Sequence, residues 1–252
     1  MWVVVTGASS GIGLELARVF AEHGCHLFLV ARNMQQLEKA ASELRKTYGT
    51  DVRVLQKDLT EPNAADELFA QLNGTGVDIF VNNAASGICG AFADTDVHKQ
   101  VETICLNTEA LTRLTKCAIV HMHKHGGGKI LNVASTGAYQ PGPYTAVYYA
   151  TKAYVLSFTQ ALRHELKGSG ICICVLCPGA TATDFARRAG KRQLKCAMTA
   201  RAVAQIAYKG LIKKRGVIIP GIWNKIAVFG SKLLPGKISA AIVARIQRRL
   251  IV

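Results

Sequence analysis

Short runs of β-branched and aliphatic residues alternate along the chain with longer segments in which apolar residues recur every three or four positions. The first pattern is typical of buried strands and the second of amphipathic helices. Strands are predicted at 2–6, 26–31, 51–56, 77–82, 129–134, 171–177 and 216–219, and helices at 11–23, 34–48, 61–72, 98–125, 146–167 and 199–213. Because strands such as 79–81 and 130–133 are apolar on both faces, we predict a doubly wound, Rossmann-type α/β fold with a parallel sheet of about seven strands.

The composition agrees with one globular domain. The chain has 252 residues, of which 50% are hydrophobic and 19% charged, and this is enough for a continuous buried core. We expect no leader ahead of the first strand, and no apolar run approaches the roughly 20 residues of a membrane-spanning helix. We therefore expect a cytoplasmic protein whose eight cysteines are reduced thiols.

A glycine-rich segment joins the first predicted strand to the first predicted helix, with three glycines in the spacing G-x3-G-x-G. Glycines at such a turn let backbone N–H groups approach a pyrophosphate, whose charge is favoured at the positive N-terminus of a helix. A purely structural strand-to-helix turn is the alternative. The segment predicts a dinucleotide site formed by Gly7, Ser9, Ser10, Gly11, Ile12 and Gly13.

The second predicted strand ends in Ala31-Arg32-Asn33, where an NAD site usually carries an acidic residue for the ribose hydroxyls. An arginine there suits a 2′-phosphate instead, and Ser9 and Ser10 supply further donors. NADP(H) is therefore the favoured cofactor, with Arg32 and Asn33 in its site. The alternative is that Arg32 is a solvated charge at the end of a strand.

Tyr148 and Lys152 are four residues apart in a predicted helix and therefore share one face. A free tyrosine titrates at about pH 10, so proton exchange with an alcohol near neutrality requires a neighbouring cation, here Lys152, to favour the phenolate. Alone, such a pair is often only a feature of a helix surface. Together with the glycine turn it predicts acid–base chemistry beside a dinucleotide.

With these motifs in order, residues 1–220 resemble the short-chain dehydrogenase/reductase family. The resemblance is carried by T-G-A-S-S-G-I-G at 6–13, Asp58-Leu59, Asn82-Asn83-Ala84, Asn107, Ser135, Tyr148 with Lys152, and Pro178-Gly179. It implies that Tyr148 is the general acid/base, that Ser135 hydrogen-bonds the substrate oxygen and that Lys152 also binds the nicotinamide ribose. Asn107 is implied to hold a water of a proton relay, with a helix kink as the alternative.

The same resemblance implies further cofactor contacts, from the adenine to the carboxamide end: Asp58, Leu59, Asn82, Ala84, Pro178, Gly179, Thr181 and Thr183. It also implies a loop over the substrate at 184–200. A homodimer or homotetramer packed through the helices near 98–125 and 146–167 is expected on the same basis. Residues 221–252 then form an extension beyond the family domain.

Two clusters suggest metal chemistry, but other interpretations are favoured. Cys172, Cys174 and Cys177 fall on one strand, and alternation places Cys177 on the opposite face, so buried apolar thiols are favoured over a metal or redox site. His121 and His125 share a helix face, but no carboxylate or cysteine neighbours them in sequence. A charged helix C-terminus is therefore favoured, and we predict no metal site.

Positive charge is confined to the last quarter of the chain. Residues 185–252 carry 16 basic and no acidic side chains, whereas residues 1–184 carry 15 basic and 16 acidic ones. Five basic residues in the expected substrate loop either bind an anionic substrate or are solvated: Arg187, Arg188, Lys191, Arg192 and Lys195. The basic extension 221–252 has helical apolar spacing, which suits peripheral association with an anionic membrane as well as packing against this chain or a second copy.

We therefore predict an NADP(H)-dependent oxidoreductase that interconverts a carbonyl and an alcohol. Reduction of an apolar ketone or aldehyde is favoured, with hydroxysteroid and fatty-acyl-derived compounds as the leading substrates. A non-catalytic NADP(H)-binding protein that docks on an anionic surface is the alternative, and the intact set of Ser135, Tyr148 and Lys152 speaks against it. Nucleic-acid binding is disfavoured because the basic quarter lacks a recognisable reading module.

Overall fold

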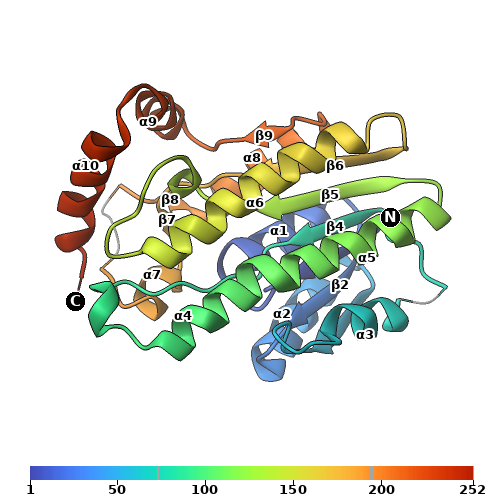
Figure 1. The fold of residues 1–252 in the computed structure, drawn as a ribbon. Helices are drawn as coiled ribbons and strands as arrows, with labels where there is room; N and C mark the ends of the chain where they lie inside the picture. Colours follow the sequence, from blue (N-terminus) through green and yellow to red (C-terminus); the bar gives the residue numbers. More distant parts are fainter. Residues whose placement is uncertain (73, 193–195, 252) are drawn as a thin grey trace.

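A seven-stranded sheet forms the centre of the computed structural model, which describes residues 1–72, 74–192 and 196–251 (Figure 1). All neighbouring strands are parallel, and their order is β3-β2-β1-β4-β5-β6-β9. The order reverses between β1 and β4, which places a topological switch point at their carboxyl ends. The predicted doubly wound parallel fold is confirmed, with strands β1 (Trp2–Thr6), β2 (His26–Ala31), β3 (Val52–Gln56), β4 (Ile79–Asn82), β5 (Gly128–Val133), β6 (Ile171–Leu176) and β9 (Val217–Ile218).

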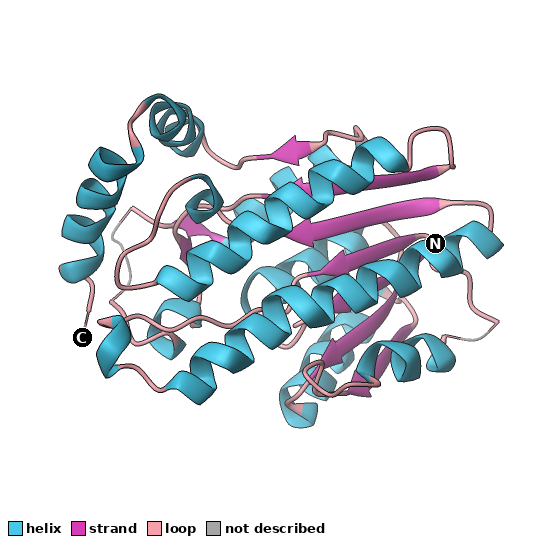
Figure 2. Cartoon of the chain, viewed as in Figure 1, coloured by secondary structure: helices cyan, strands magenta, loops and turns pink. Residues whose placement is uncertain are grey.

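Helices cover both faces of the sheet (Figure 2). One face packs against α1 (Gly11–Glu22), α2 (Met34–Tyr48) and α8 (Ala200–Ile212), and the other against α3 (Ala64–Gln71), α5 (Leu111–Lys124) and α6 (Ala146–Glu165). Alternation along β1 supplies both layers, because Val3 and Val5 join the first core and Val4 joins the second. The strands are therefore apolar on both faces, as the sequence indicated.

The long helix expected at 98–125 is divided. It consists of α4 (Val97–Ile104), a π-helical segment η2 (Cys105–Ala110) and α5. A π segment inserts an extra residue per turn and is frequent at functional sites. Smaller elements that were not predicted are η1 (Phe92–Asp94), η3 (Thr136–Tyr139), α7 (Phe185–Arg188) and a second sheet of β7 (Thr181–Ala182) and β8 (Met198–Thr199).

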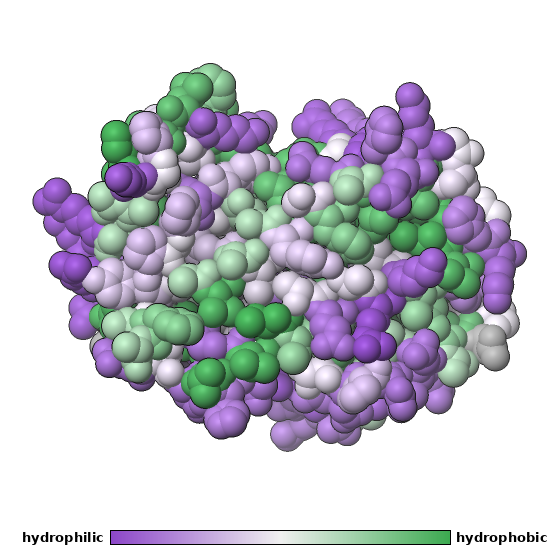
Figure 3. Space-filling view, viewed as in Figure 1, coloured by the Kyte–Doolittle hydropathy of each residue, from purple (hydrophilic) through white to green (hydrophobic). Residues whose placement is uncertain are grey.

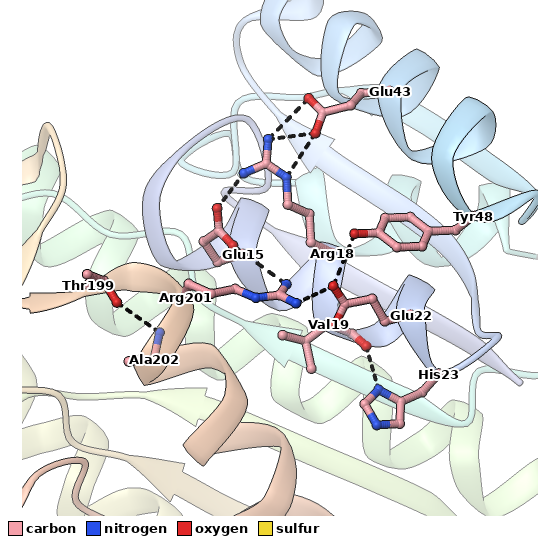
Figure 4. Close-up of polar contacts among 10 residues, drawn as sticks. All are labelled: Glu15, Arg18, Val19, Glu22, His23, Glu43, Tyr48, Thr199, Arg201 and Ala202. Atoms are coloured by element: carbon pink, nitrogen blue, oxygen red, sulfur yellow. Dashed lines mark hydrogen bonds and ion pairs between the residues drawn. The ribbon is translucent and has the colours of Figure 1, made fainter.

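A polar network ties α1 to its neighbours α2 and α8 (Figure 4). Arg18 of α1 pairs with Glu15 on its own helix and with Glu43 of α2, where its Nη2 atom lies 2.8 Å from Oε1. Arg201 of α8 pairs with Glu22 of α1. These carboxylates are already engaged by arginines of the same domain, so we assign the network to bracing the helices that position the glycine turn.

Two further helices follow β9: α9 (Ile222–Leu233) and α10 (Gly236–Arg248). Figure 1 shows them one after the other, in orange-red and red, at one end of the molecule beyond the carboxyl ends of the strands. The helical apolar spacing seen in residues 221–252 is thus realised as two helices. Among the described residues, no helix has both the length and the apolar character to cross a bilayer.

Candidate active site

The carboxyl ends of β1, β4, β5 and β6 bring the predicted catalytic residues together. Ser135 follows β5 and accepts a hydrogen bond from the backbone N–H of Gly137 at 3.1 Å, which begins η3. Tyr148 and Lys152 lie in the first two turns of α6. Ser135 is close enough to Tyr148 to oppose the rise that burial causes in the pKa of its phenol, and its Oγ atom also donates to the carbonyl of Pro178 at 3.5 Å. The structure therefore places Ser135 beside Tyr148, and the catalytic roles of the two hydroxyls stay predictions.

Burial dominates the electrostatics of Tyr148. Removal of the phenol from solvent raises its pKa, and the hydrogen bond with Ser135 opposes this only in part. The expected depression of this pKa by Lys152 is absent, although the Nζ atom of Lys152 lies 5.7 Å from the centroid of the tyrosine ring. The tyrosine is consequently a neutral phenol at neutral pH, which is the form that donates a proton.

Lys152 is almost completely buried, and its ammonium group donates a hydrogen bond to the backbone carbonyl of Val133 at 2.8 Å. Desolvation lowers its pKa to about 8. The bond to Val133 fixes the side chain between the end of β5 and the tyrosine. The remaining donors of the ammonium group are free to bind a hydroxyl brought into the site.

Asn107 lies in the π-helical segment and holds the loop that follows β4. Its Oδ1 atom accepts from the backbone N–H of Ser86 at 3.0 Å, and its Nδ2 atom donates to the carbonyl of Ser86 at 2.9 Å and to Oγ1 of Thr151 at 3.0 Å. From its place in the π-helical segment, the side-chain amide of Asn107 thus reaches both the loop after β4 and helix α6. The amide has a positioning role here, and the predicted water relay stays a prediction.

Gly87 on the same loop leaves room for the tyrosine ring. A Cβ atom at this position would lie 2.8 Å from Cδ2 of Tyr148 and 3.3 Å from Cζ of Phe185. The rings of Tyr148 and Phe185 are themselves packed, with centroids 5.3 Å apart. Phe185 belongs to the predicted substrate loop, so this loop contacts the candidate acid directly.

The glycine turn after β1 is held against the loop after β4 by Thr6 and Asn83. The Oγ1 atom of Thr6 accepts from the backbone N–H groups of Asn83 and Ala84 at 3.0 and 3.1 Å. The Nδ2 atom of Asn83 donates to the carbonyls of Thr6 and Gly7 at 2.9 and 3.2 Å. Gly7 requires its glycine, because its φ is +64° and a Cβ atom would lie 2.9 Å from the Cα of Ala84.

The turn fits a pyrophosphate. Helix α1 begins after Ser10, whose side chain makes no capping hydrogen bond, and no acidic residue lies in its first turn. Its N-terminal N–H groups and positive dipole therefore remain available to an anion. An open cleft of about 500 Å³ lies in front of them and is lined by Ser9, Ser10, Gly11, Leu14, Glu15, Arg18, Ala182, Thr183, Asp184 and Ala200.

Arg32 directly follows strand β2, Asp58 lies just after the neighbouring strand β3, and their side chains are close together. The guanidinium Nη1 of Arg32 is 3.7 Å from Oδ2 of Asp58, and its side chain is 69% exposed. Burial raises the pKa of Asp58, but hydrogen bonds from Thr60 and the charge of Arg32 outweigh it and hold the pKa below its usual value. Asn33 caps α2 by accepting from Gln36 N–H at 2.9 Å.

Two predicted cofactor residues point their side chains into the protein. Leu59 belongs to the core between the sheet and α3. The Nδ2 atom of Asn82 donates to Oγ1 of Thr115 at 3.0 Å and to Oδ1 of Asn132 at 3.1 Å, inside the sheet. Their side chains are therefore structural, and any contact they make with a cofactor passes through the backbone.

The segment after β6 closes the site from the other side. The carbonyl of Pro178 accepts from the backbone N–H of Thr136 at 2.9 Å, and Thr181 donates to the carbonyl of Gly179 at 3.0 Å. Thr183 packs against Gly11, whose Cβ atom would lie 3.2 Å from its Cγ2 atom. Thr183, which was predicted to contact the carboxamide of the nicotinamide, therefore lies against the glycine turn that follows β1.

The basic residues of the substrate loop do not act as one group. Arg187 is largely exposed and pairs with Asp184 at 3.0 Å, whereas Arg188 donates to Oγ of Ser10 at 3.4 Å. Lys191 is half-buried, and desolvation lowers its pKa. Arg192 is exposed. Lys195 lies outside the described residues.

The predicted cysteine and histidine clusters serve the fold. Cys174 and Cys177 are buried in different parts of the core, as predicted for apolar thiols. The rings of His121 and His125 are stacked with centroids 4.2 Å apart. Burial and the charge of His125 lower the pKa of His121, so the expected positive charge at this helix end is weakened.

The motifs and their geometry agree with what comparisons find. The family model for short chain dehydrogenase matches residues 1–194. The chain belongs to the short-chain dehydrogenase/reductase family. A curated relative in this family, 17-beta-hydroxysteroid dehydrogenase type 3 of Mus musculus, is 32% identical over 199 residues, which are 78% of this chain and 65% of the relative. The chain thus spans less than two thirds of that relative's length.

Solved structures of short-chain dehydrogenases cover nearly the whole chain. The short-chain dehydrogenase from Sphingobium yanoikuyae in complex with NADPH is 34% identical, with a TM-score of 0.83 over 92% of this chain and 94% of that one. The bulky-bulky ketone specific alcohol dehydrogenase from Comamonas testosteroni is 32% identical, with a TM-score of 0.79 over 92% of each chain. The fold is therefore that of the family.

Sequence reasoning assigned no role to four residues that build the site of this short-chain dehydrogenase/reductase: Thr6, Asn83, Ser86 and Gly87. They carry no reactive group, and each acts by holding a backbone segment or by leaving space for a ring. Two of them, Thr6 and Asn83, lie within motifs that were recognised, and this was the available signal for them.

Proposed function

We propose that this protein interconverts a carbonyl and an alcohol with NADP(H), and that reduction of an apolar ketone or aldehyde is its activity in the cell. One observation carries the proposal. Ser135 lies beside Tyr148 and partly opposes the rise that burial causes in its pKa, and the buried ammonium group of Lys152 lies 5.7 Å from the centroid of the tyrosine ring, at the carboxyl-end edge of the sheet where the glycine turn also lies. Such a set binds and protonates a carbonyl oxygen.

The bound nicotinamide supplies the hydride that adds to the carbonyl carbon. Ser135 holds the carbonyl oxygen by a hydrogen bond, and Tyr148 donates its phenolic proton to that oxygen. The raised pKa of Tyr148 keeps this proton in place at neutral pH, which favours the reductive direction. Lys152, when charged, stabilises the phenolate left behind and binds a ribose hydroxyl, since its carbonyl partner Val133 occupies only one of its three donors.

The choice of NADP(H) rests on the charge around the adenosine end. Arg32 is exposed at the end of β2, where a guanidinium reaches a 2′-phosphate. Its acidic neighbour Asp58 binds Thr60 through Oδ1, and only the long 3.7 Å contact of Oδ2 with Arg32 competes with a phosphate. Arg188 approaches the glycine turn at Ser10 and adds positive charge near the pyrophosphate. The complex of the Sphingobium yanoikuyae enzyme with NADPH supports the same choice.

The proposed substrate class rests on the aromatic surroundings of Tyr148 and on the substrate loop. The ring of Tyr148 packs against those of Phe185 and Tyr149, with centroids 5.3 and 6.1 Å apart, and Lys191 is a half-buried cation of the same loop as Phe185. An apolar ketone or aldehyde with a distal anionic group suits this combination, and hydroxysteroid and fatty-acyl-derived compounds are of this kind. Relatives named for hydroxysteroids and for bulky ketones support it.

Self-association through α4, α5 and α6 is part of the proposal. These helices leave apolar side chains in solvent on the described surface, among them Val97, Val101, Ile104 and Tyr154. Sedimentation velocity of the purified chain tests this directly. A dimer or tetramer supports it, and a monomer at all concentrations refutes it.

The activity is tested with a panel of carbonyl compounds and NADPH, followed by the fall in NADPH absorbance. The panel should contain 3-keto and 17-keto steroids, 3-oxoacyl thioesters, bulky aryl ketones and short aldehydes. We expect turnover of at least one bulky apolar class, and slower turnover with NADH. Absence of turnover with every class, although NADPH binds, would favour the non-catalytic alternative.

A further inference from the structure

Helix α9 exposes an apolar face to solvent. Ile222, Ile226, Phe229 and Leu233 recur at helical spacing on one side and are 53 to 70% exposed, and Trp223 beside them is 78% exposed. Figure 3 shows apolar atoms gathered over this helix at the upper left, although the opposite side of the molecule lies out of view. A soluble domain seldom leaves so many large apolar side chains together in water without a partner.

The fold fixes α9 with this face outward. Val228, on the inner side, is buried, and the Nδ2 atom of Asn224 donates to the carbonyl of Pro220 at 2.7 Å. Lys232 lies with its Nζ atom 5.1 Å from the ring centroid of Tyr139 in η3. The helix is thus anchored through a narrow inner stripe, and turning its apolar face inward would break these contacts.

Helix α10 continues the pattern beyond Pro235. Ser239, Val243 and Gln247 are buried on its inner side, and Gln247 donates to the hydroxyl of Tyr149 at 3.0 Å. Half-exposed isoleucines recur at every fourth position beside this stripe: Ile238, Ile242 and Ile246. The two helices therefore present apolar side chains while their inner sides hold them to the catalytic domain.

The charge around these faces identifies the partner. Residues 221–252 contain six basic side chains and no acidic one: Lys225, Lys232, Lys237, Arg245, Arg248 and Arg249. A second copy docked face to face would bring like charges together, whereas an anionic lipid surface offers both an apolar layer and negative headgroups. We propose that α9 and α10 form a docking surface for anionic phospholipid bilayers, with the α9 apolar face in the headgroup boundary.

Trp223 provides a direct readout with the full-length protein. Vesicles of phosphatidylglycerol and phosphatidylcholine in equal parts should shift its emission to shorter wavelength and carry the protein into the vesicle pellet. Vesicles of phosphatidylcholine alone should do so much less. Trp223→Phe should abolish the spectral shift but still pellet, because Trp2 lies against Arg53 and His26, far from α9 in the fold.

Two pairs of variants separate the apolar and electrostatic parts. Ile226→Ser with Phe229→Ser should weaken vesicle binding at least about tenfold, while Met34→Ser with Ile212→Ser, also exposed apolar positions, should leave it unchanged. Lys225→Gln with Lys237→Gln should weaken it about 30-fold at low salt, and Lys39→Gln with Lys46→Gln on α2 only slightly. Thermal unfolding checks that each variant is folded.

Salt provides a further test of the charge. Binding should weaken between about 0.01 M and 0.1 M salt, because the Debye length falls from roughly 30 Å to about 10 Å. Failure of the wild type to bind anionic vesicles at low salt would overturn the proposal. The proposal would also be overturned if the control pairs lowered vesicle binding as much as the α9 pair does. A third contrary result is self-association without vesicles that is abolished by Ile226→Ser with Phe229→Ser, because it would assign the apolar face to a second copy of the chain.

Discussion

Asn107 and Ser86 form a reciprocal pair, in which the amide of one residue satisfies both backbone groups of the other. Asn107 is 1% exposed, so neither of these groups of Ser86 has water as a ready substitute. The pair joins the π-helical segment to the loop that carries Gly87, and Gly87 in turn contacts the ring of Tyr148. Asn107 thereby holds the loop that packs against the ring of Tyr148, and through Thr151 it also reaches the helix that carries this residue.

Asn107→Leu should reduce the free energy of unfolding by about 2 kcal/mol. Leucine is similar in size to asparagine, but it leaves the backbone N–H and carbonyl of Ser86 and the hydroxyl of Thr151 without this partner. Urea unfolding measures this. Asn63→Leu is the control, because Asn63 is exposed and its side chain makes no capping hydrogen bond, so its effect should stay within about 0.5 kcal/mol. Equal stability of the two variants would contradict the role of the pair.

Gly87→Ala should lower kcat by roughly tenfold or more while the chain remains folded. The added Cβ atom would lie 2.8 Å from the ring of Tyr148, so the ring must move, and displacement of about 1 Å is costly in catalysis. Gly230→Ala is the control, because it makes the same substitution at a position where the added Cβ atom would have no neighbour within 4 Å. Unchanged kcat in Gly87→Ala would show that the position of Tyr148 tolerates this shift.

Arg32→Ala should weaken NADPH binding by about 1.5–3 kcal/mol and hardly change NADH binding, because a charge-assisted bond to the 2′-phosphate is lost. The exposure of Arg32 places the expected effect toward the lower end of that range. Isothermal titration with both cofactors measures it, and Arg53→Ala on β3 is the control. Equal losses for the two cofactors would refute the assignment.

The buried Lys152 predicts a pH dependence of stability. Its pKa falls from 10.5 to about 8 on folding, so between these values the unfolded chain binds more protons than the folded one. The stability of the wild type relative to Lys152→Met should therefore increase as the pH rises through this window, by up to about 3 kcal/mol. Urea unfolding at about pH 8 and about pH 10 checks this, and a constant difference would contradict the desolvation of Lys152.

Periodicity and motifs predicted the sheet and most helices because each depends on a local pattern. Strands β1 and β2 were predicted at the bounds that the structure shows, since both are bounded by turn residues. The division of the helix at 98–125 was not predicted. Asn107 stands in an otherwise helical sequence, and its π turn depends on Ser86 and Thr151, which are distant in the chain.

The candidate catalytic residues could be predicted because the sequence shows which reactive side chains are present. It does not show how deeply each side chain is buried or which groups it contacts, and these decide its pKa. The sequence placed Lys152 one turn from Tyr148, and from this a lowered tyrosine pKa was expected. Burial of both side chains and the bond from Lys152 to Val133 reverse that shift. Contacts of α10 with Tyr144 and Tyr149, made by Arg248 and Gln247, likewise arise only when distant segments meet.

The most direct test of the account is the Tyr148→Phe variant, measured for turnover of the best carbonyl substrate and for NADPH binding on the same preparation. Only the proton donor is removed, so the account predicts turnover reduced by at least about 10²-fold with NADPH affinity nearly unchanged. Lys152→Met, measured alongside, should lose both turnover and NADPH affinity. Turnover of Tyr148→Phe near that of the wild type would contradict the assignment of Tyr148 as the acid.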